Sequence, residues 1–531
     1  METPTPTAGA RHLALSLAMT VCVGALAAQP VQIDSGLVQG VPGSDASIRV
    51  FKGIPYAAPP VGDLRWREPQ PVAPWKGVRS ADRFGARAMQ ARIFADMIFR
   101  DDGPSEDCLY LNVWTPAKSA SERLPVMVWI YGGGLQAGSS SEPRQDGENL
   151  ARRGVVLVSM NYRLGVFGYM AHPDLTRESG RSASGNYGFM DQIAALRWVQ
   201  HNIAAFGGDP GNVTIFGESA GSYSVSVLMA SPVARGLFHK AIGESGALLG
   251  SRLVPEHTRS LAEAEKNGEE FGKMLGAASI AKMRALPADE LLKEARAHES
   301  VRAGAVVDGY ILPLDPAAIY ATGAESRVPL LAGWNADEQR VDAVFGDKRP
   351  TAASFARMVR QDFGADADRL LKLYPASTEQ EAVRSAGDLA GDRFIAFGTW
   401  KWIELHLRTS GAPVYRFSFD RAVPIEPGRV INGAPATEAD VGAVHASEIS
   451  YVFGALASLK DVTVRPEDWR LSDEMGAYWT NFAKTGNPNA KGLPEWPRYE
   501  ATTGYQVMHL DTVSAAAADA HRDRYEFLNS D

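Results

Sequence analysis

The sequence predicts an α/β fold with a large, mostly parallel and twisted central sheet, an antiparallel N-terminal edge and helices on both faces. A continuous apolar run at 126–131 and a mostly apolar one at 155–160 are typical of strands buried on both faces. An amphipathic helix is expected over 186–203, and a further strand at 213–218 follows it. This alternation of strands and helices is the pattern of a parallel sheet covered by helices.

The chain has 531 residues, and between residues 30 and 531 it shows no linker, low-complexity run, charge block or repeat. We therefore expect residues 29–531 to form a single domain. The net charge of −8 and the scattered Lys and Arg side chains make nucleic acid an improbable partner. The sequence contains no metal-binding motif such as His-Glu-x-x-His, so we expect neither a metal nor a cofactor. The oligomeric state is left open.

Residues 1–28 have the features of a secretory signal peptide. Arg11 precedes a mostly apolar run over 13–28 that ends in small residues suited to cleavage. This run is shorter than the roughly 20 residues that a membrane span needs, so an anchor is the weaker interpretation. A lipoprotein site at Cys22 is disfavoured because a large residue precedes it. We expect a secreted or periplasmic protein whose mature chain keeps one cysteine, Cys108, and therefore no intrachain disulfide.

The N-terminal half contains several further strand signals. Residues 31–40 alternate and turn like a hairpin, which suits an antiparallel edge. The prolines of 51–62 exclude a helix there, and alternating large residues over 105–114 predict a strand face. In the second half, residues 251–327 are predicted to be mostly helical, covering the sheet edge and part of the pocket wall. A strand at 328–333 follows them.

The strand at 213–218 leads into Ser219, which lies between Gly217 and Gly221. This is the pattern of a nucleophile elbow, in which the chain turns sharply from strand into helix and leaves room only for very small residues two positions before and two positions after the serine. The small residues of 222–230 continue as a helix, so its free N–H groups would lie next to the Ser219 hydroxyl.

A glycine-rich loop, Gly132–Gly138, follows the strand at 126–131. No Gly-Lys-Ser/Thr follows the loop, so it does not match a nucleotide-binding loop. Backbone N–H groups unshielded by side chains can instead approach the negative oxygen of a tetrahedral intermediate. An oxyanion-binding role is therefore the favoured interpretation.

Residues 206–221 resemble, over the full length of the motif, the serine signature of the type B carboxylesterase and cholinesterase family of α/β-hydrolases. Residues 105–114 resemble its second signature. The resemblance covers nearly the whole mature chain and implies the α/β-hydrolase fold. It also implies a serine hydrolase that cleaves carboxylic esters through an acyl-enzyme intermediate. It assigns the oxyanion-hole donors to Gly133, Gly134 and Ala220.

A serine nucleophile needs a histidine base and an acid that orients the base, and in α/β-hydrolases the chain order is serine, acid, histidine. Among the histidines after residue 333, His406 and His509 are explained as faces of a helix and a strand, and His521 lies in an alanine-rich tail. This leaves His445, in the loop 442–449, as the candidate base. The family's histidine motif also matches there.

The acid is expected at the carboxyl end of a strand, because ligands gather there in open parallel sheets. Asp337 and Glu338 both qualify, and the resemblance favours Glu338. We expect Glu218, Glu448 and Ser245 to lie around these groups. Two carboxylates close together in a poorly solvated pocket cannot both ionise cheaply, so Glu218 and Glu448 are predicted to share a proton or a water.

Two alternative functions are disfavoured by particular residues. A catalytically dead adhesion module of the same fold should lack the serine, whereas this chain keeps Ser219, Glu338 and His445 together. A cholinesterase needs an aromatic box for a quaternary ammonium. The loop 76–105 contains no Trp, and Leu135 stands where those enzymes carry Phe. The acyl and alcohol groups of the ester are left open.

The resemblance also implies two features of the loop that precedes Cys108. Glu106 is expected to pair with Arg65 and fix the base of the loop between them. In related enzymes the cysteine of this motif closes a disulfide with an upstream cysteine, and Ala88 occupies that place here. We therefore expect the segment 88–108 to be more mobile than in its relatives and to widen the entrance for bulky esters.

Overall fold

The structure is a computed structural model that describes residues 1–2, 29–254, 258–298, 301, 303–346, 348–426, 428–431, 434–460 and 462–530. The predicted signal peptide falls mostly on residues outside the described ones. Within the described ranges, no helix is long and apolar enough to cross a membrane.

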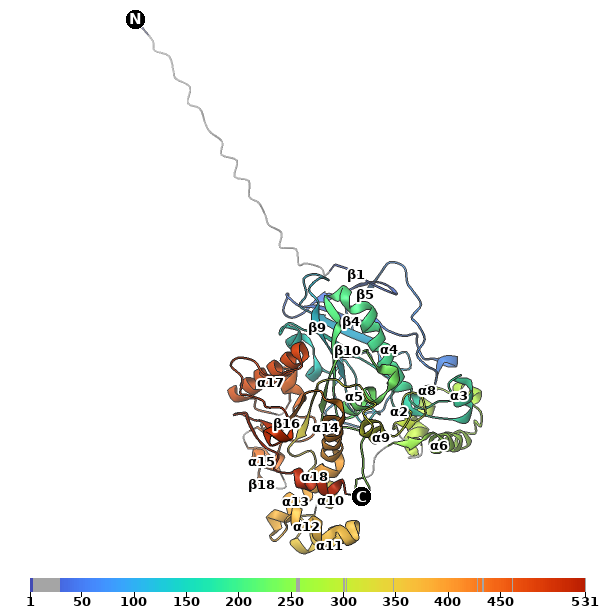
Figure 1. Cartoon of the computed structure of the whole chain (residues 1–531). Helices are drawn as coiled ribbons and strands as arrows, with labels where there is room; N and C mark the ends of the chain where they lie inside the picture. The colour runs from blue at the N-terminus through green and yellow to red at the C-terminus, as the bar shows by residue number, and fades with distance from the viewer. Residues whose placement is uncertain are drawn as a thin grey trace.

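An eleven-stranded sheet runs through the centre of the molecule (Figure 1). Its strands, in spatial order, are β20 (Ala515–Ala518), β19 (Gln506–Leu510), β16 (Val414–Phe419), β15 (Leu330–Asn335), β12 (Lys240–Glu244), β11 (Gly208–Glu218), β9 (Leu124–Ile130), β10 (Val156–Met160), β8 (Tyr110–Thr115), β4 (Arg49–Pro55) and β3 (Val41–Pro42). All neighbours from β19 to β10 are parallel, whereas β8, β4 and β3 pair antiparallel. The mostly parallel sheet with an antiparallel N-terminal edge is therefore confirmed.

The apolar runs of the sequence occupy the middle of this sheet. β9 lies between β10 and β11, and Val128 pairs with Val158 on one side and Ile215 on the other. These side chains have no exposed surface, because helices cover both faces of the sheet. The buried centre of the sheet fixes the carboxyl ends of its strands, where the candidate site lies.

The hairpin expected over 31–40 is present, but it does not belong to the edge of the large sheet. β1 (Val31–Ile33) and β2 (Gly36–Gln39) pair antiparallel, and β2 pairs on its other side with β5 (Val78–Ser80) in a separate three-stranded sheet. The prediction of an edge position was therefore wrong. The partner strand β5 is distant in sequence, and the local alternation of polar and apolar residues carries no information about it.

Helices cover both faces of the large sheet (Figure 1). α4 (Tyr187–Asn202), α5 (Ala220–Ala230) and α14 (Phe397–Ser410) pack on one face, and α17 (Pro466–Thr485) packs on the other. α17 begins with Pro466 in its first turn and ends at Gly486, which adopts the left-handed conformation. These helices provide the covering layers that a mostly parallel sheet requires.

Helices lie in the region after β12, as predicted, but loops and two short strands, β13 (Arg259–Ser260) and β14 (Val306–Val307), occupy much of it. It contains α6 (Leu261–Met274), α7 (Ile280–Arg284), α8 (Ala288–Ala297) and α9 (Pro316–Ala321). A second helical group lies farther along the chain, close to α18 in Figure 1, and comprises α11 (Ala352–Phe363), α12 (Ala367–Leu373) and α13 (Glu379–Gly391). The short helices are α1 (Glu148–Ala151), α2 (Gly165–Tyr169), α3 (Pro173–Glu178), α10 (Asp342–Phe345), α15 (Glu438–Val441), α16 (Ile449–Val452) and α18 (Arg522–Leu528).

The predicted pairing of Arg65 with Glu106 is confirmed. The Arg65 guanidinium donates from Nε and Nη2 to the two carboxylate oxygens of Glu106, both at 2.6 Å. Arg65 Nη1 also donates to the carbonyl of Leu286, at 2.8 Å. Both partners are largely buried, so this pair ties the base of the loop to the region of α7.

Cys108 is a free thiol and is buried. Burial raises the pKa of this thiol well above its usual range, so the thiolate is disfavoured. Ala88, which occupies the place of the missing cysteine partner, lies in β6 (Arg87–Ala88), a short strand parallel to β7 (Pro104–Ser105). The loop between these strands is therefore closed by backbone pairing.

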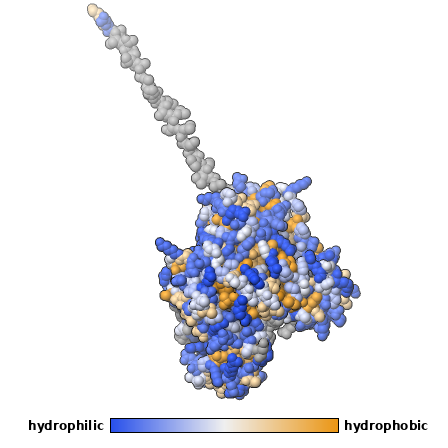
Figure 2. All heavy atoms as spheres, in the orientation of Figure 1, coloured by the Kyte–Doolittle hydropathy of each residue, from blue (hydrophilic) through white to orange (hydrophobic). Residues whose placement is uncertain are grey.

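The face of the molecule in Figure 2 is mostly hydrophilic, and its hydrophobic patches are small and scattered. Large hydrophobic side chains that remain exposed include Ile93, Phe94 and Ile98, all in the loop between β6 and β7. This loop also borders the candidate site described below.

Candidate active site

Ser219 lies at the turn between β11 and α5. Its backbone has φ 54° and ψ −121°, a strained conformation for a residue other than glycine. A Cβ atom on Gly221 would lie 1.9 Å from the Ile130 carbonyl oxygen, and one on Gly217 would lie 2.6 Å from the carbonyl carbon of Gly221. Only glycines fit two residues before and two residues after Ser219, so the local sequence enforces the elbow.

The adjacent strand β12 repeats the same local sequence in register. Gly217 pairs with Gly243, and Glu218 pairs with Glu244. Ser245 also has φ 54°. Its backbone N–H donates to the Gly333 carbonyl at 2.8 Å, and its buried hydroxyl has no partner among the described residues. Ser245 thus lies at the same edge of the sheet as the elbow.

Glu338 and His445 come together from loops at the carboxyl ends of the strands. Glu338 follows β15, and His445 lies between α15 and α16. His445 Nδ1 lies 2.6 Å from Glu338 Oε2. The other carboxylate oxygen, Oε1, accepts a hydrogen bond from the backbone N–H of Asn335 at 2.8 Å. Glu338 is therefore held from both sides, with one oxygen directed at the imidazole.

Asp337, the alternative acid, contacts the backbone of the histidine loop and not the ring. Its Oδ2 accepts from the Ala443 N–H at 2.9 Å, and its own N–H donates to the Ala443 carbonyl at 3.0 Å. Asn335 Nδ2 adds a hydrogen bond to the Val444 carbonyl at 2.7 Å. The geometry therefore favours Glu338 over Asp337 as the partner of His445, while Asp337 aligns the loop.

The other imidazole nitrogen points to the elbow. His445 Nε2 lies 3.2 Å from Oε1 of Glu218, the residue before Ser219. The elbow in turn packs against the glycine-rich loop, because a Cβ atom on Gly132 would lie 2.9 Å from Ser219 Cβ. His445 thus bridges Glu338 and the strand end that carries Ser219.

The glycine-rich loop exposes backbone N–H groups beside the elbow. Gly133 and Gly134 have φ of 111° and 63°, and a Cβ atom on Gly133 would lie 2.2 Å from the Ala137 carbonyl oxygen. Among the described residues, no acceptor takes up the N–H of Gly133, Gly134 or Ala220. Unpaired N–H groups next to a serine are what an oxyanion site requires.

Buried carboxyl groups surround the imidazole. Glu448 Oε2 accepts from Asn335 Nδ2 at 2.6 Å, and Glu244 Oε1 accepts from Trp479 Nε1 at 2.8 Å. Burial raises the pKa of Glu218 to about 8 and that of Glu448 to about 7, and it raises the pKa of Glu244 well above its usual range. Sequence reasoning missed Glu244, although the repeated Gly-Glu-Ser was a usable signal.

Burial of His445 disfavours its charged form, but the carboxylates of Glu218 and Glu338 outweigh this effect and raise the pKa of His445 to about 10. The shifts of His445 and Glu218 are linked, because a proton on Glu218 removes one of the charges that raise the pKa of His445. The imidazole and its neighbouring carboxyls therefore share protons near neutral pH.

A pocket of about 300 Å³ adjoins the glycine-rich loop at Gln136. Its other walls come from the loop after β6, from α2 and from the end of α8. Their apolar side chains are Met89, Ala91, Ile93, Val166, Leu292 and Ala295, and Arg296 and His298 add polar groups. Phe394, which is partly exposed, packs its ring edge-to-face against His445 with the ring centroids 5.1 Å apart. Apolar walls beside a few polar groups are typical of small-molecule sites.

The described residues include no group of three or more His, Cys, Asp or Glu side chains that could hold a metal ion. An elbow serine, a histidine paired with a glutamate and free backbone donors at the carboxyl ends of parallel strands are the components of a serine hydrolase site on an α/β-hydrolase fold.

The comparison with protein families agrees with this class. Residues 27–528 match the model of the carboxylesterase family, so the chain belongs to that family. It is 37% identical over 492 residues to the fumonisin B1 esterase of Sphingopyxis macrogoltabida, covering 88% of this chain and 84% of that protein. It is 34% identical to the cocaine esterase of Homo sapiens, covering 92% and 88%.

Solved structures agree as well. A PNB esterase superposes with a TM-score of 0.79 at 33% identity, covering 95% of this chain and 100% of that one. A carboxylesterase of Geobacillus stearothermophilus superposes with a TM-score of 0.77, also at 33% identity, covering 94% and 100%. The α/β-hydrolase fold is therefore confirmed, and the chain is a carboxylic-ester hydrolase.

Proposed function

We propose that Ser219 attacks the ester carbonyl while His445 takes its proton and then returns a proton to the leaving alcohol. Glu338 orients the imidazole and stabilises its charged form. The N–H groups of Gly133, Gly134 and Ala220 stabilise the oxyanion. An acyl-enzyme forms on Ser219, and water releases the acid. The contact of His445 with Glu338, placed beside the elbow and its free donors, carries this assignment.

Replacement of Ser219 tests the assignment, and the chain offers a matched control. Ser219→Ala should abolish hydrolysis of p-nitrophenyl esters while the fold is retained, because the triad acts as a unit. Ser245→Ala changes the same residue type, in the same backbone conformation, at the end of the next strand. It should keep activity of the same order. Loss of turnover in Ser245→Ala alone would contradict the assignment.

The pocket supports esters that carry an apolar group, on either the acyl or the alcohol side. Each buried CH₂ group contributes about 0.8 kcal/mol, so kcat/KM should rise with chain length until the pocket is filled. Ala295→Trp should lower kcat/KM for octanoyl or octyl esters more than for acetates. Ala297→Trp, at the exposed end of the same helix, serves as the control. If both variants changed kcat/KM for the long-chain esters equally, the pocket would not be the site that binds the apolar group.

We also propose that the protein is exported through residues 1–28 and acts as a single domain over 29–531. The strands of the large sheet come from both ends of that range, which favours one domain. N-terminal sequencing of the protein from the culture medium or the periplasm tests export. A mature N-terminus near residue 29 is expected, and an intact Met1 in an internal fraction would contradict export.

A further inference from the structure

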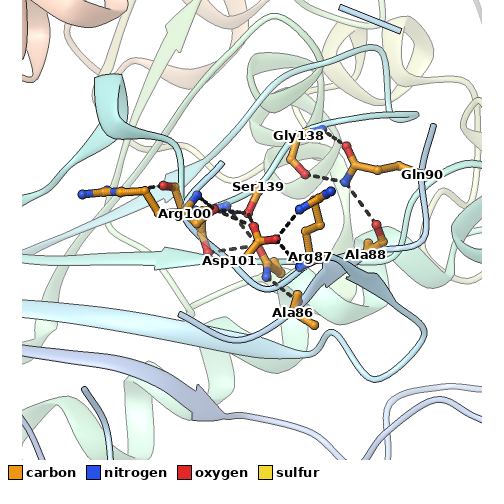
Figure 3. A network of polar contacts seen from close by, with 12 residues as sticks. Ala86, Arg87, Ala88, Gln90, Arg100, Asp101, Gly138 and Ser139 are labelled. Carbon is orange, nitrogen blue, oxygen red and sulfur yellow. Dashed lines mark hydrogen bonds and ion pairs between the residues drawn. The ribbon is translucent and has the colours of Figure 1, made fainter. Parts of the chain in front are cut away.

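One side chain satisfies both backbone groups of Gly138, the last residue of the glycine-rich loop (Figure 3). Gln90 Oε1 accepts from the Gly138 N–H at 2.9 Å, and Gln90 Nε2 donates to the Gly138 carbonyl at 2.7 Å. The same Nε2 donates to the Ala88 carbonyl at 3.1 Å. Gln90 is buried, so these bonds are shielded from water. The amide thus pairs with Gly138 as an adjacent strand would.

A buried carboxylate holds the residues that follow Gly138. The Asp101 side chain has no exposed surface and forms an ion pair with Arg87. It accepts hydrogen bonds from the hydroxyls of Ser139, at 2.9 Å, and Ser141, at 2.6 Å, and from the Gly103 N–H at 3.1 Å. Figure 3 shows Asp101 between Arg87 and Ser139. We call Gln90, Asp101 and Arg87, with Gly138, Ser139 and Ser141, the polar clamp.

The two ends of the glycine-rich loop are in contact, so the position of Gly138 affects that of Gly132 and Gly133. The Gly133 carbonyl accepts from the N–H groups of Gln136, at 3.1 Å, and Ala137, at 3.0 Å. A Cβ atom on Gly138 would lie 2.7 Å from the Gly132 carbonyl oxygen. A displacement of Gly138 would therefore move Gly132 and Gly133 as well.

We propose that Gln90 and Asp101 are positioning residues for the oxyanion hole. Gln90 fixes Gly138 and Asp101 fixes the two serines after it, and together they hold the N–H groups of Gly133 and Gly134 in the direction of the developing negative charge. This inference rests on the proposed roles of Ser219 and the glycine loop. Donors stabilise a transition state only when they are placed in advance, and a displacement of about 1 Å can cost roughly 10²-fold in rate.

The polar clamp also bears on the missing disulfide. A bridge between positions 88 and 108 would close the loop only onto itself. The clamp instead joins this loop to residues 138–141, across 48 positions in the case of Gln90 and Gly138. Because Met89 and Ala91 flank Gln90 and line the apolar pocket, the same contacts place the pocket wall relative to the oxyanion loop.

Three variants separate positioning from general stability. Gln90→Met keeps the length of the side chain and removes both bonds to Gly138, and Asp101→Asn removes the buried charge. Glu106→Gln is the control, because Glu106 lies at the base of the same loop and its carboxylate accepts hydrogen bonds from Arg65. The measurements are Tm, kcat and KM for p-nitrophenyl acetate, and the Ki of an alkyl trifluoromethyl ketone. The serine oxygen adds to the carbonyl carbon of this ketone, and the carbonyl oxygen becomes an oxyanion in the hole.

We expect Gln90→Met and Asp101→Asn to lower kcat by about 10- to 100-fold with little change in KM, and to raise the Ki of the ketone by a similar factor. Glu106→Gln should lower Tm but leave kcat and the Ki of the ketone as in the parent. If Gln90→Met or Asp101→Asn fails to fold, Ser139→Ala removes a single hydroxyl from the clamp and should show a smaller loss of kcat and of ketone affinity.

The positioning role is overturned if the folded clamp variants keep the kcat and ketone affinity of the parent. It is also overturned if Glu106→Gln, at an equal loss of Tm, shows the same kinetic change. Failure of the proposed function is distinguishable, since Ser219→Ala would then retain hydrolysis in the same assay.

Discussion

His445 presents its Nε2 to Glu218 Oε1 at 3.2 Å, while its Nδ1 lies 2.6 Å from Glu338. The proposed base is therefore enclosed by two carboxyl groups, and both raise its pKa. Serine attack needs a neutral imidazole, so activity should increase with pH from neutral into the alkaline range. Glu218, which directly precedes the proposed nucleophile, should set part of this dependence.

Glu218→Gln should move the acid limb of the pH profile to lower pH. The change removes one negative charge from beside His445, which lowers the imidazole pKa, so the neutral base is present at lower pH. The same loss weakens stabilisation of the imidazolium formed during attack, and kcat at high pH should fall by about tenfold. The measurement is kcat/KM as a function of pH. Glu263→Gln, on the exposed side of α6, is the control. An acid limb at the same pH in Glu218→Gln as in the parent would contradict the proposed effect of Glu218 on the pKa of His445.

Glu448→Gln should stabilise the protein at alkaline pH. Burial raises the pKa of Glu448 to about 7 from 4.5, so the fold favours the protonated form. The contribution of Glu448 to the free energy of unfolding is fully present below the pKa that this group has in the unfolded chain. It is lost as the pH rises through about 7. Glutamine mimics the protonated form, so the free energy of unfolding should exceed that of the parent above this pH, by roughly 1–3 kcal/mol. Urea unfolding at several pH values measures this, and a pH-independent difference would be contrary evidence.

The elbow, the glycine-rich loop and the strand alternation could be predicted because each is a local pattern. Glycines around Ser219 and apolar runs such as 126–131 specify their conformation within a few residues. Assigning Glu338 over Asp337 needed the resemblance, since both follow the same strand. The contact geometry then separated them, because only Glu338 reaches the ring.

The contacts between distant segments could not be predicted in this way. The polar clamp joins residues 48 and 38 positions apart, as in Gln90 with Gly138 and Asp101 with Ser139, and no local periodicity indicates it. Likewise, the partner of the hairpin at 31–40 depends on β5. The strand β16 was missed although it alternates, with Tyr415 and Phe417 on one side.

The pair of Arg65 and Glu106 predicts a clear stability difference. Glu106→Gln leaves a buried guanidinium without its counter-charge and should lower the free energy of unfolding by about 3 kcal/mol. Glu68→Gln breaks the exposed pair with Arg181 and should cost less than about 1 kcal/mol. Chemical denaturation of both variants measures the difference. Equal costs would show that burial does not govern the first pair.

Cys108 should react with a thiol reagent only after unfolding, because it is free and buried. Titration of the native and the denatured protein checks this, and no thiol even in denaturant would mean a bridged or modified cysteine.

Hydrogen exchange over 88–108 tests the mobility expected from the missing disulfide. The clamp should confine fast exchange to 91–99, between Gln90 and Asp101. Protection equal to that of β9 throughout would contradict the expectation.

The most direct test of the central claim is mass spectrometry of the protein after reaction with a slowly hydrolysed organophosphate ester. The mechanism predicts one adduct per chain, on the peptide that contains Ser219, with loss of esterase activity in proportion to labelling. Ser219→Ala should acquire no adduct, whereas Ser245→Ala should label as the parent does. A fully inhibited protein whose adduct lies on any residue other than Ser219 would contradict the account.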